Sequence, residues 1–350
     1  MRSFRAARIS RIGLCLAIAA AGGFLAARLG VPLPFMLGAI AATLAAALIQ
    51  APIDPPKALV PFMRVIIGVL LGSAITPDLF ARFAGLGFSL LLTPVYVAIA
   101  SVIGVVYYTT IGGLGRNEAF LASLPGGLYS TMALAEDAGV ESRRIMLAQT
   151  LRVALVVMAL PYIVVYLADE TRSDLIINTA YLRDIPVREI LLLTLAGAVG
   201  WVVGLGLRIP AGQIMGPILV SAAMHLTGIV DAKPPQEIII AAQIVLGAAI
   251  GARFVGIDLR ALARAAALSV GFIALMILLT VVFAQAVDVF VGVPATTGLL
   301  GYAPGGLAEM SLVALGLNLD VGFVSTLHIA RLMLVLALTP VIWHKIADQK

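Results

Sequence analysis

Two arginines lie deep inside apolar segments, and their surroundings repeat along the chain. Arg152 and Arg331 each have a polar side chain three residues earlier, Gln149 and His328, which a helix would put on the same face. A charge at that depth in a membrane is costly and normally faces a polar interior or a partner. We therefore expect both guanidinium groups to point inward. They could contact an anionic ligand, or they could hold backbone carbonyl groups in place.

A Pro-Gly-Gly sequence interrupts an apolar segment in each half of the chain, as Pro125-Gly126-Gly127 and as Pro304-Gly305-Gly306. Proline removes a backbone donor and clashes with the preceding turn, and two glycines leave the backbone unrestrained. A helix broken there would present a partly positive N-terminal end, which suits an anion, and a partly negative C-terminal end, which suits a cation. The alternative is a tight turn between two helices at the membrane surface.

An acid stands beside only the second of these breaks. Glu309 occupies the position where the first copy has Ser130. A carboxylate present once per molecule suits coupling to a proton or cation, and capping of the following half-helix is the competing role. The candidate substrate-binding and coupling residues are Pro125, Gly126, Gly127, Ser130, Thr131, Gln149, Arg152, Pro304, Gly305, Gly306, Glu309, His328 and Arg331.

Metal, redox and nucleotide chemistry find little support in the sequence. The three histidines, His225, His328 and His344, fall in different segments without a second histidine at i+4 or a carboxylate cluster. There is no Walker loop. The single cysteine, Cys15, excludes an intrachain disulfide and leaves the redox compartment open. We expect no catalytic residue, no metal and no cofactor, and we expect that the protein is not an enzyme.

The candidate residues recur because the chain contains one membrane unit twice, at an offset of 179 residues. Besides the Pro-Gly-Gly sequences and the arginines, Gly68 matches Gly247 and Gly72 matches Gly251 at this offset. Chance similarity between two apolar sequences is the alternative, but matched Pro, Gly and Arg in one gapless register argue against it. A duplicated, interrupted hydrophobic unit is typical of secondary transporters.

Composition sets the class of protein. The chain of 350 residues is 61% hydrophobic and 12% charged, with a net charge of +5, whereas a soluble domain carries about a quarter charged residues. Apolar segments recur at the length that about 30 Å of hydrocarbon requires. In the first copy they are 12–29, 33–50, 58–75, 83–110, the interrupted 117–138 and 143–167. In the second they are 190–207, 212–229, 238–256, 266–292, the interrupted 296–317 and 321–343.

The sequence thus predicts an all-α, polytopic integral membrane protein of about 10–12 transmembrane segments. Its expected parts are a cytoplasmic tail (1–11), a first membrane repeat (12–168), a linker (169–189) and a second membrane repeat (190–345). The connecting segments leave no room for a nucleic-acid-binding domain. Ten crossings would give inverted repeats of five, and twelve would give parallel repeats; basic residues at both ends favour an even total.

Two further alternatives stay open. The Arg-rich start followed by an apolar run also resembles a signal peptide, but segment 12–29 has a counterpart at 190–207 inside the chain, which favours a retained first span. Gly68 with Gly72, and Gly247 with Gly251, are small-xxx-small motifs. We expect them to pack helices within one chain, with a homodimer as the other reading.

The duplicated Pro-Gly-Gly segments and the stretch Gly30–Gly38 (GVPLPFMLG) resemble the AbrB family of bacterial membrane proteins over about residues 12–345. Members carry this duplication and are labelled regulators of gene expression or ammonia monooxygenases. The family in turn resembles the cation–proton antiporter and anion transporter group, in which broken helices cross at the membrane midplane. The run from Gly72 to Phe80 is similar to the bile-acid symporter branch. The paired aspartates of the sodium–proton antiporters are missing from segment 143–167.

The resemblance implies a multi-pass protein of the bacterial cytoplasmic (inner) membrane. The leading hypothesis is a secondary transporter or exporter of a small anionic solute by alternating access. The expected partners are that solute, a proton or cation, and the lipid bilayer. The first alternative is a membrane sensor or regulator of gene expression on a transporter fold, and the second is the ammonia monooxygenase of the family label.

Overall fold

The computed structural model describes residues 2–75, 83–124, 142–168, 179–209 and 211–347. Within these ranges every regular element is a helix, and no strand occurs. Seven of the helices are long and apolar enough to cross a membrane, and four shorter apolar helices accompany them. The prediction of a polytopic, all-α membrane protein is therefore confirmed.

The chain forms two compact units, and each unit takes matching helices from both sequence repeats. The first unit comprises Met1–Phe80, Pro161–Ile257 and Ser311–Gly322. Its main helices are α1 (Arg2–Arg28), α2 (Pro34–Leu48), α3 (Val60–Ser73), α9 (Val187–Gly206), α10 (Gly212–Leu226) and α11 (Gln236–Gly251). From Arg2 onward, the predicted tail 1–11 is part of α1.

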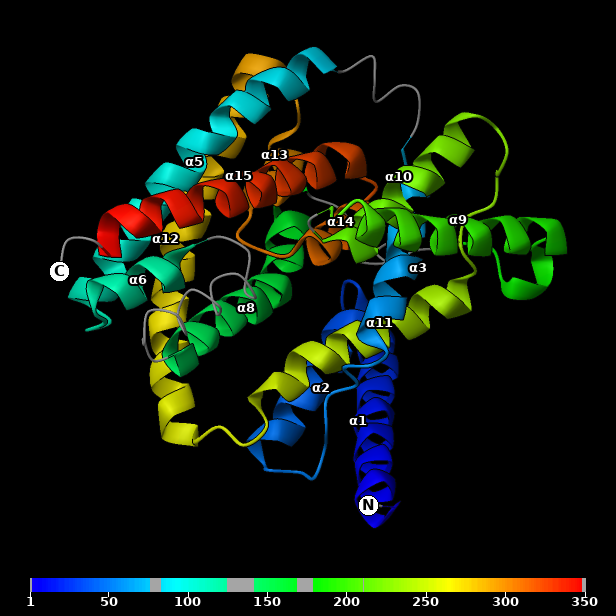
Figure 1. Cartoon of the computed structure of the whole chain (residues 1–350), viewed down its shortest axis with the longest axis horizontal. Helices are drawn as coiled ribbons and strands as arrows, with labels where there is room; N and C mark the ends of the chain where they lie inside the picture. Colours follow the sequence, from blue (N-terminus) through cyan, green and yellow to red (C-terminus); the bar gives the residue numbers. More distant parts are fainter. Residues whose placement is uncertain (1, 76–82, 125–141, 169–178, 210, 348–350) are drawn as a thin grey trace. The chain divides into compact units, whose positions relative to one another are not determined.

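Glycines lock the two repeats together in this unit. A Cβ atom at Gly68 of α3 would lie 2.6 Å from the Ile214 carbonyl oxygen of α10, and one at Gly247 of α11 would lie 2.7 Å from the Met36 oxygen of α2. Side chains do not fit at such distances, so the backbones pack directly, as small-xxx-small motifs allow. Helix α3 therefore packs on α10 of the other repeat, and α11 packs on α2, which lies beside it in Figure 1. Packing within the chain is confirmed for these motifs.

Helices α2 and α10 are matching short helices in the two repeats. Each contains 15 residues and follows a residue in the left-handed conformation, Leu33 with φ 46° and Ala211 with φ 53°. Fifteen helical residues cover about 22 Å, which is less than the roughly 30 Å of a hydrocarbon core. Both helices are largely buried within their unit. Their length favours a half-inserted element over a full crossing for the predicted segments 33–50 and 212–229.

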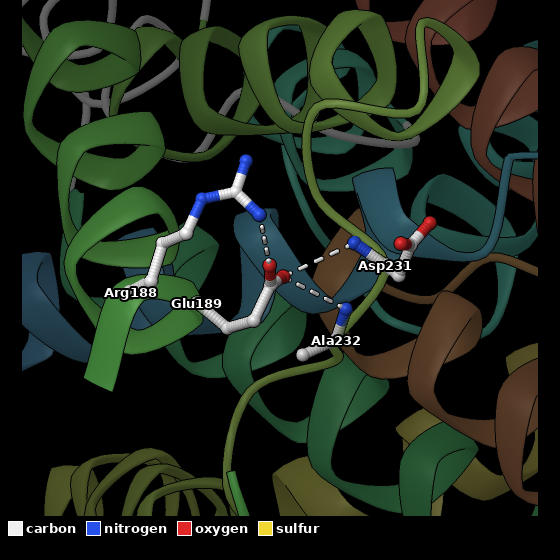
Figure 2. Close-up of polar contacts among 4 residues, drawn as sticks. All are labelled: Arg188, Glu189, Asp231 and Ala232. Atoms are coloured by element: carbon white, nitrogen blue, oxygen red, sulfur yellow. Dashed lines mark hydrogen bonds and ion pairs between the residues drawn. The ribbon is translucent and has the colours of Figure 1, made fainter. Parts of the chain in front are cut away.

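A carboxylate near the start of α9 ties the second repeat together. Figure 2 shows Glu189 between Arg188 and the loop that joins α10 to α11. Its Oε2 atom accepts hydrogen bonds from the backbone N–H groups of Asp231 (3.1 Å) and Ala232 (3.2 Å), and Arg188 is paired with it at 3.6 Å. The loop is thus held by backbone hydrogen bonds to a charged acceptor, which are stronger than neutral ones. We assign Glu189 a structural role.

The second compact unit comprises Ala81–Leu160, Asp258–Met310 and Phe323–Lys350, and it carries the candidate site. Its helices are α5 (Phe83–Thr110), α6 (Arg116–Ser123), most of α8 (Ser142–Ala168), α12 (Leu259–Val291), α13 (Ala295–Tyr302), the start of α14 (Leu307–Gly316) and most of α15 (Val321–Ala347). Its core is rich in aromatic rings from α5, α6, α12 and α13. This core surrounds the ends of the short helices α6 and α13.

Candidate functional site

The second Pro-Gly-Gly sequence interrupts a helix, as the sequence predicts. Helix α13 ends at Tyr302 and α14 begins at Leu307, so the residues 303–306 have no helical structure. Residues 301–305 are buried, and Ala303 has no exposed surface. The break therefore lies inside the unit, which excludes the alternative of a surface turn in this copy. In the first copy, Pro125, Gly126 and Gly127, with Ser130 and Thr131, fall outside the described residues.

Arg331 of α15 holds the broken end of α13. Its Nη1 atom donates to the carbonyl oxygens of Tyr302 (3.4 Å) and Ala303 (2.5 Å), and its Nη2 atom donates to the oxygen of Gly305 (2.8 Å). The last carbonyl groups of a helix have no partner within the helix, and they carry a partial negative charge. A guanidinium group both donates hydrogen bonds to these carbonyl groups and offsets their partial negative charge. The side chain is 5% exposed, so this contact occurs away from lipid and solvent.

His328, one turn before Arg331, completes the same contact and must be neutral. Its Nε2 atom lies 2.9 Å from the Leu300 carbonyl oxygen, and its Nδ1 atom lies 2.7 Å from Nη2 of Arg331. A carbonyl oxygen can only accept and an arginine can only donate. The proton therefore resides on Nε2, and Nδ1 accepts from the arginine. His328 fixes the guanidinium in position and does not carry a charge in this arrangement.

The first repeat has the same arrangement at the end of α6. The amide Nε2 atom of Gln149 donates to the Leu121 oxygen at 2.7 Å, as His328 does to Leu300. Arg152 donates to the oxygens of Leu124 (2.9 Å), Ser123 (3.3 Å) and Ala122 (3.5 Å). Its side chain is 3% exposed. The prediction that both arginines point inward toward the interrupted segments is confirmed, and both hold helix-end carbonyl groups.

Glu309 lies in the first turn of α14. The site where Gly306 would carry a Cβ atom is occupied by its Oε2 atom, so the carboxylate folds back over the N-terminal end of its own helix. A negative charge there is stabilised by the partly positive helix end. This geometry agrees with the capping role, and the coupling role stays a prediction. Gly305 is constrained as well, because its Cβ atom would lie 2.8 Å from the Met310 side chain.

An aromatic cluster beside the second break was not predicted. The ring of Tyr302 packs against those of Tyr96 (5.3 Å between centroids) and Phe283 (5.5 Å). The Tyr302 hydroxyl donates to the Ser89 oxygen at 2.7 Å, and the hydroxyl groups of Tyr96 and Thr280 are hydrogen-bonded at 3.1 Å. The sequence feature that could have indicated this cluster is the presence of tyrosines in the middle of apolar segments. Among the described residues, no cluster of three His, Cys, Asp or Glu side chains could hold a metal ion.

Known proteins match almost the whole chain. Residues 35–347 match a family model described as "Transition state regulatory protein AbrB". The chain is 27% identical over 358 aligned positions to "Uncharacterized protein YhjN" of Bacillus subtilis (strain 168), with 93% of this chain and 90% of the relative covered. It is also 27% identical over 327 positions to "Putative regulator AbrB" of Escherichia coli (strain K12), with 91% of each covered. The matches include every element that builds the candidate site.

Proposed function

The chain belongs to the AbrB family, and from that premise we propose that it is a secondary transporter or exporter of a small anionic solute that works by alternating access. The observation that carries the proposal is the buried break between α13 and α14, held by Arg331. Breaking a helix at membrane depth exposes backbone groups that need protein or water partners. Discontinuous helices in duplicated membrane units commonly form the substrate and ion sites of transporters.

Two features support an anion as the solute. The N-terminal end of α14 carries a partly positive charge, part of which the Glu309 carboxylate offsets. Arg152 and Arg331 add two buried guanidinium groups to the same unit. Among the described residues, the ion pairs involve neither arginine. The carbonyl end of a helix offsets only about half a charge, so a guanidinium group bound to it keeps positive charge that an anion would neutralise.

The test is transport by the purified full-length protein in proteoliposomes. Acetate, succinate, citrate and sulfate are first screened by thermal stabilisation, and those that stabilise the protein are then offered in labelled form. We expect saturable exchange of labelled for unlabelled anion, and accumulation when a proton or sodium gradient is imposed. Liposomes without protein serve as the control. If neither these anions nor a matching set of amines and neutral solutes exchanges across the membrane, the transport proposal is wrong.

We further propose that Glu309 couples solute movement to a proton or cation, and its substitution separates this role from capping. Glu309→Gln retains a hydrogen-bond acceptor at the start of α14 but cannot bind and release a proton. We expect complete loss of accumulation against a gradient, with exchange between equal concentrations preserved. The measurement compares both modes in the same proteoliposomes at several pH values.

Glu118 provides a matched control for this variant. It also stands in the first turn of a short helix, α6, where its Oε2 atom accepts from the Gly115 N–H group at 3.4 Å. Glu118→Gln should therefore keep accumulation. If Glu309→Gln accumulates solute with the pH dependence of the parent protein, Glu309 is only a cap.

A regulator on the same fold is the second candidate function, because the Escherichia coli relative is named as a regulator. In that case the protein would bind a ligand and change gene expression, but it would not carry the ligand across the membrane. The two functions differ in proteoliposomes, where a sensor binds the anion but does not exchange it. We propose no enzymatic activity, and the ammonia monooxygenase reading would require a redox metal in the purified protein.

A further inference from the structure

Three buried polar atoms in the second unit have no hydrogen-bond partner within the described part of the chain. They are Nε of Arg152, the hydroxyl of Tyr108 and the hydroxyl of Ser269. Their side chains are 3%, 2% and 1% exposed. Leaving a buried donor unpaired costs about 1–3 kcal/mol, and more for a charged group. Such groups call for a partner, which can be a water molecule, an ion or a bound ligand.

The three atoms belong to one region, where α5, α12 and the end of α6 meet. The Tyr108 ring packs on the Phe272 ring, with 4.9 Å between centroids, and Phe272 lies one turn after Ser269 on α12. One turn before Tyr108, a Cβ atom at Gly104 would lie 3.2 Å from both the Phe272 ring and Cα of Ser123. The carbonyl oxygen of Ser123 in turn accepts a hydrogen bond from Arg152. The Tyr108 hydroxyl also lies within electrostatic range of the Arg152 guanidinium.

The equivalent region around Arg331 lacks this set of donors, of which Arg152 and Tyr108 belong to the first repeat and Ser269 to the second. At the offset of 179 residues, Val287 stands in place of Tyr108 and Leu90 in place of Ser269. Phe283 and Tyr302 stand in place of Gly104 and Ser123, and their rings pack together. The equivalent region is therefore filled by aromatic side chains, whereas the first repeat has a glycine and a serine there.

The two arginines also differ in the hydrogen bonds that they make to described residues. Arg331 makes four hydrogen bonds, three of them at 2.8 Å or less, and one of these goes to the Nδ1 atom of His328. With the described residues Arg152 makes three, of which only the one to Leu124 is shorter than 3.3 Å; Gly126, the counterpart of Gly305, lies outside the described residues. The short hydrogen bonds of Arg331 indicate that its guanidinium group serves as a structural clamp. The longer bonds and the unpaired Nε–H group leave Arg152 able to bind something else.

We infer that Arg152 and Tyr108 form the anion-binding site of the protein, and that Arg331 serves only to hold the backbone. The Nε–H group of Arg152 and the hydroxyl of Tyr108 donate to a small oxyanion, with the hydroxyl of Ser269 as a third donor. The Nε–H group can only donate and both hydroxyl groups are able to donate, so the set suits a ligand with two or more acceptor oxygens, as in a carboxylate or a sulfate. The inference rests on the proposed function and assigns its substrate class to the region around Arg152 rather than to its counterpart around Arg331.

Two neighbouring tyrosines give a matched test. The Tyr107 hydroxyl donates to the Leu268 oxygen at 2.9 Å, whereas the Tyr108 hydroxyl has no partner in the described residues. Tyr108→Phe should therefore leave the thermal stability of the anion-free protein unchanged but weaken the binding of acetate, succinate or sulfate about tenfold or more. Tyr107→Phe should do the reverse, with lower stability and unchanged anion binding. The measurement is thermal unfolding in detergent, titrated with each sodium salt against sodium chloride at equal ionic strength.

Arg152→Lys provides a second arm, because it keeps the positive charge but removes the Nε–H donor. We expect it to abolish the stabilisation by oxyanions. Equal anion responses in Tyr108→Phe and the parent protein would overturn the site, and so would the absence of any oxyanion response in the parent protein. Exchange of an amine or a neutral solute in proteoliposomes would leave the transport proposal standing while removing this inference. The two failures are therefore distinguishable.

Discussion

Replacing Arg331 by methionine is expected to destabilise the protein on the order of 3–5 kcal/mol, because it leaves several buried acceptors unpaired at about 1–3 kcal/mol each. Methionine has a similar length but no donor. The substitution leaves the carbonyl groups of Tyr302, Ala303 and Gly305, together with Nδ1 of His328, without their shared donor. Thermal unfolding of the purified protein in detergent measures the loss. The stability of Arg331→Lys should lie between those of the parent protein and Arg331→Met. An ammonium group keeps the charge but lacks the planar set of donors that reaches these four acceptors.

Arg183 is the control for this prediction. Its side chain is 82% exposed and pairs with Asp184 at 3.5 Å, and exposed pairs contribute about 0–1 kcal/mol. Arg183→Met should unfold at the temperature of the parent protein. If Arg331→Met also unfolds at the temperature of the parent protein, the end of α13 does not depend on its guanidinium clamp.

Alanine at Gly68 or Gly247 is expected to cost about 1–3 kcal/mol, because one added methyl group overpacks a close helix contact. The atom it meets at each site is a backbone carbonyl oxygen, that of Ile214 at 2.6 Å or that of Met36 at 2.7 Å. Backbone cannot rotate away as a side chain can, so the helices must separate. Thermal unfolding in detergent again provides the measurement.

Substitution of Gly13 by alanine is expected to change the stability in the opposite direction. It lies within α1 of the same unit, and a Cβ atom there would meet nothing within 4 Å. A helix-interior glycine costs about 0.5–1 kcal/mol relative to alanine, so Gly13→Ala should stabilise the protein slightly. If Gly68→Ala and Gly13→Ala shift the midpoint equally, the direct backbone packing of α3 on α10 is not what holds this unit together.

Local chemistry made part of this structure predictable from the sequence. The break at Pro304-Gly305-Gly306 follows from the missing donor and the absent side chains, which act on neighbouring residues. The inward direction of Arg331 follows from the cost of a charge in lipid. Both depend on interactions that the residue types determine wherever the helix lies.

Contacts between distant segments could not be predicted. The sequence left open whether Arg152 binds a ligand or carbonyl groups, because the answer depends on where the end of α6 lies relative to α8. The clustering of Tyr96 with Tyr302 likewise depends on how α5 meets α13. Leu33 and Ala211 adopt left-handed conformations that neither residue type favours. The division into two units was also hidden, since each unit combines parts of both repeats.

The exchange of helices between the repeats has a consequence for how the protein is made. Helix α3 leaves the ribosome before α10 exists, and α2 before α11, so the glycine surface of α3 and the surface of α2 that meets the α11 glycines have no partner until the second repeat is made. The newly inserted first half must wait in the bilayer, with its small-residue surfaces facing lipid, until translation delivers the second. A chain that stops between the repeats would lack the helices that α2 and α3 pack against, so the first unit could not be completed.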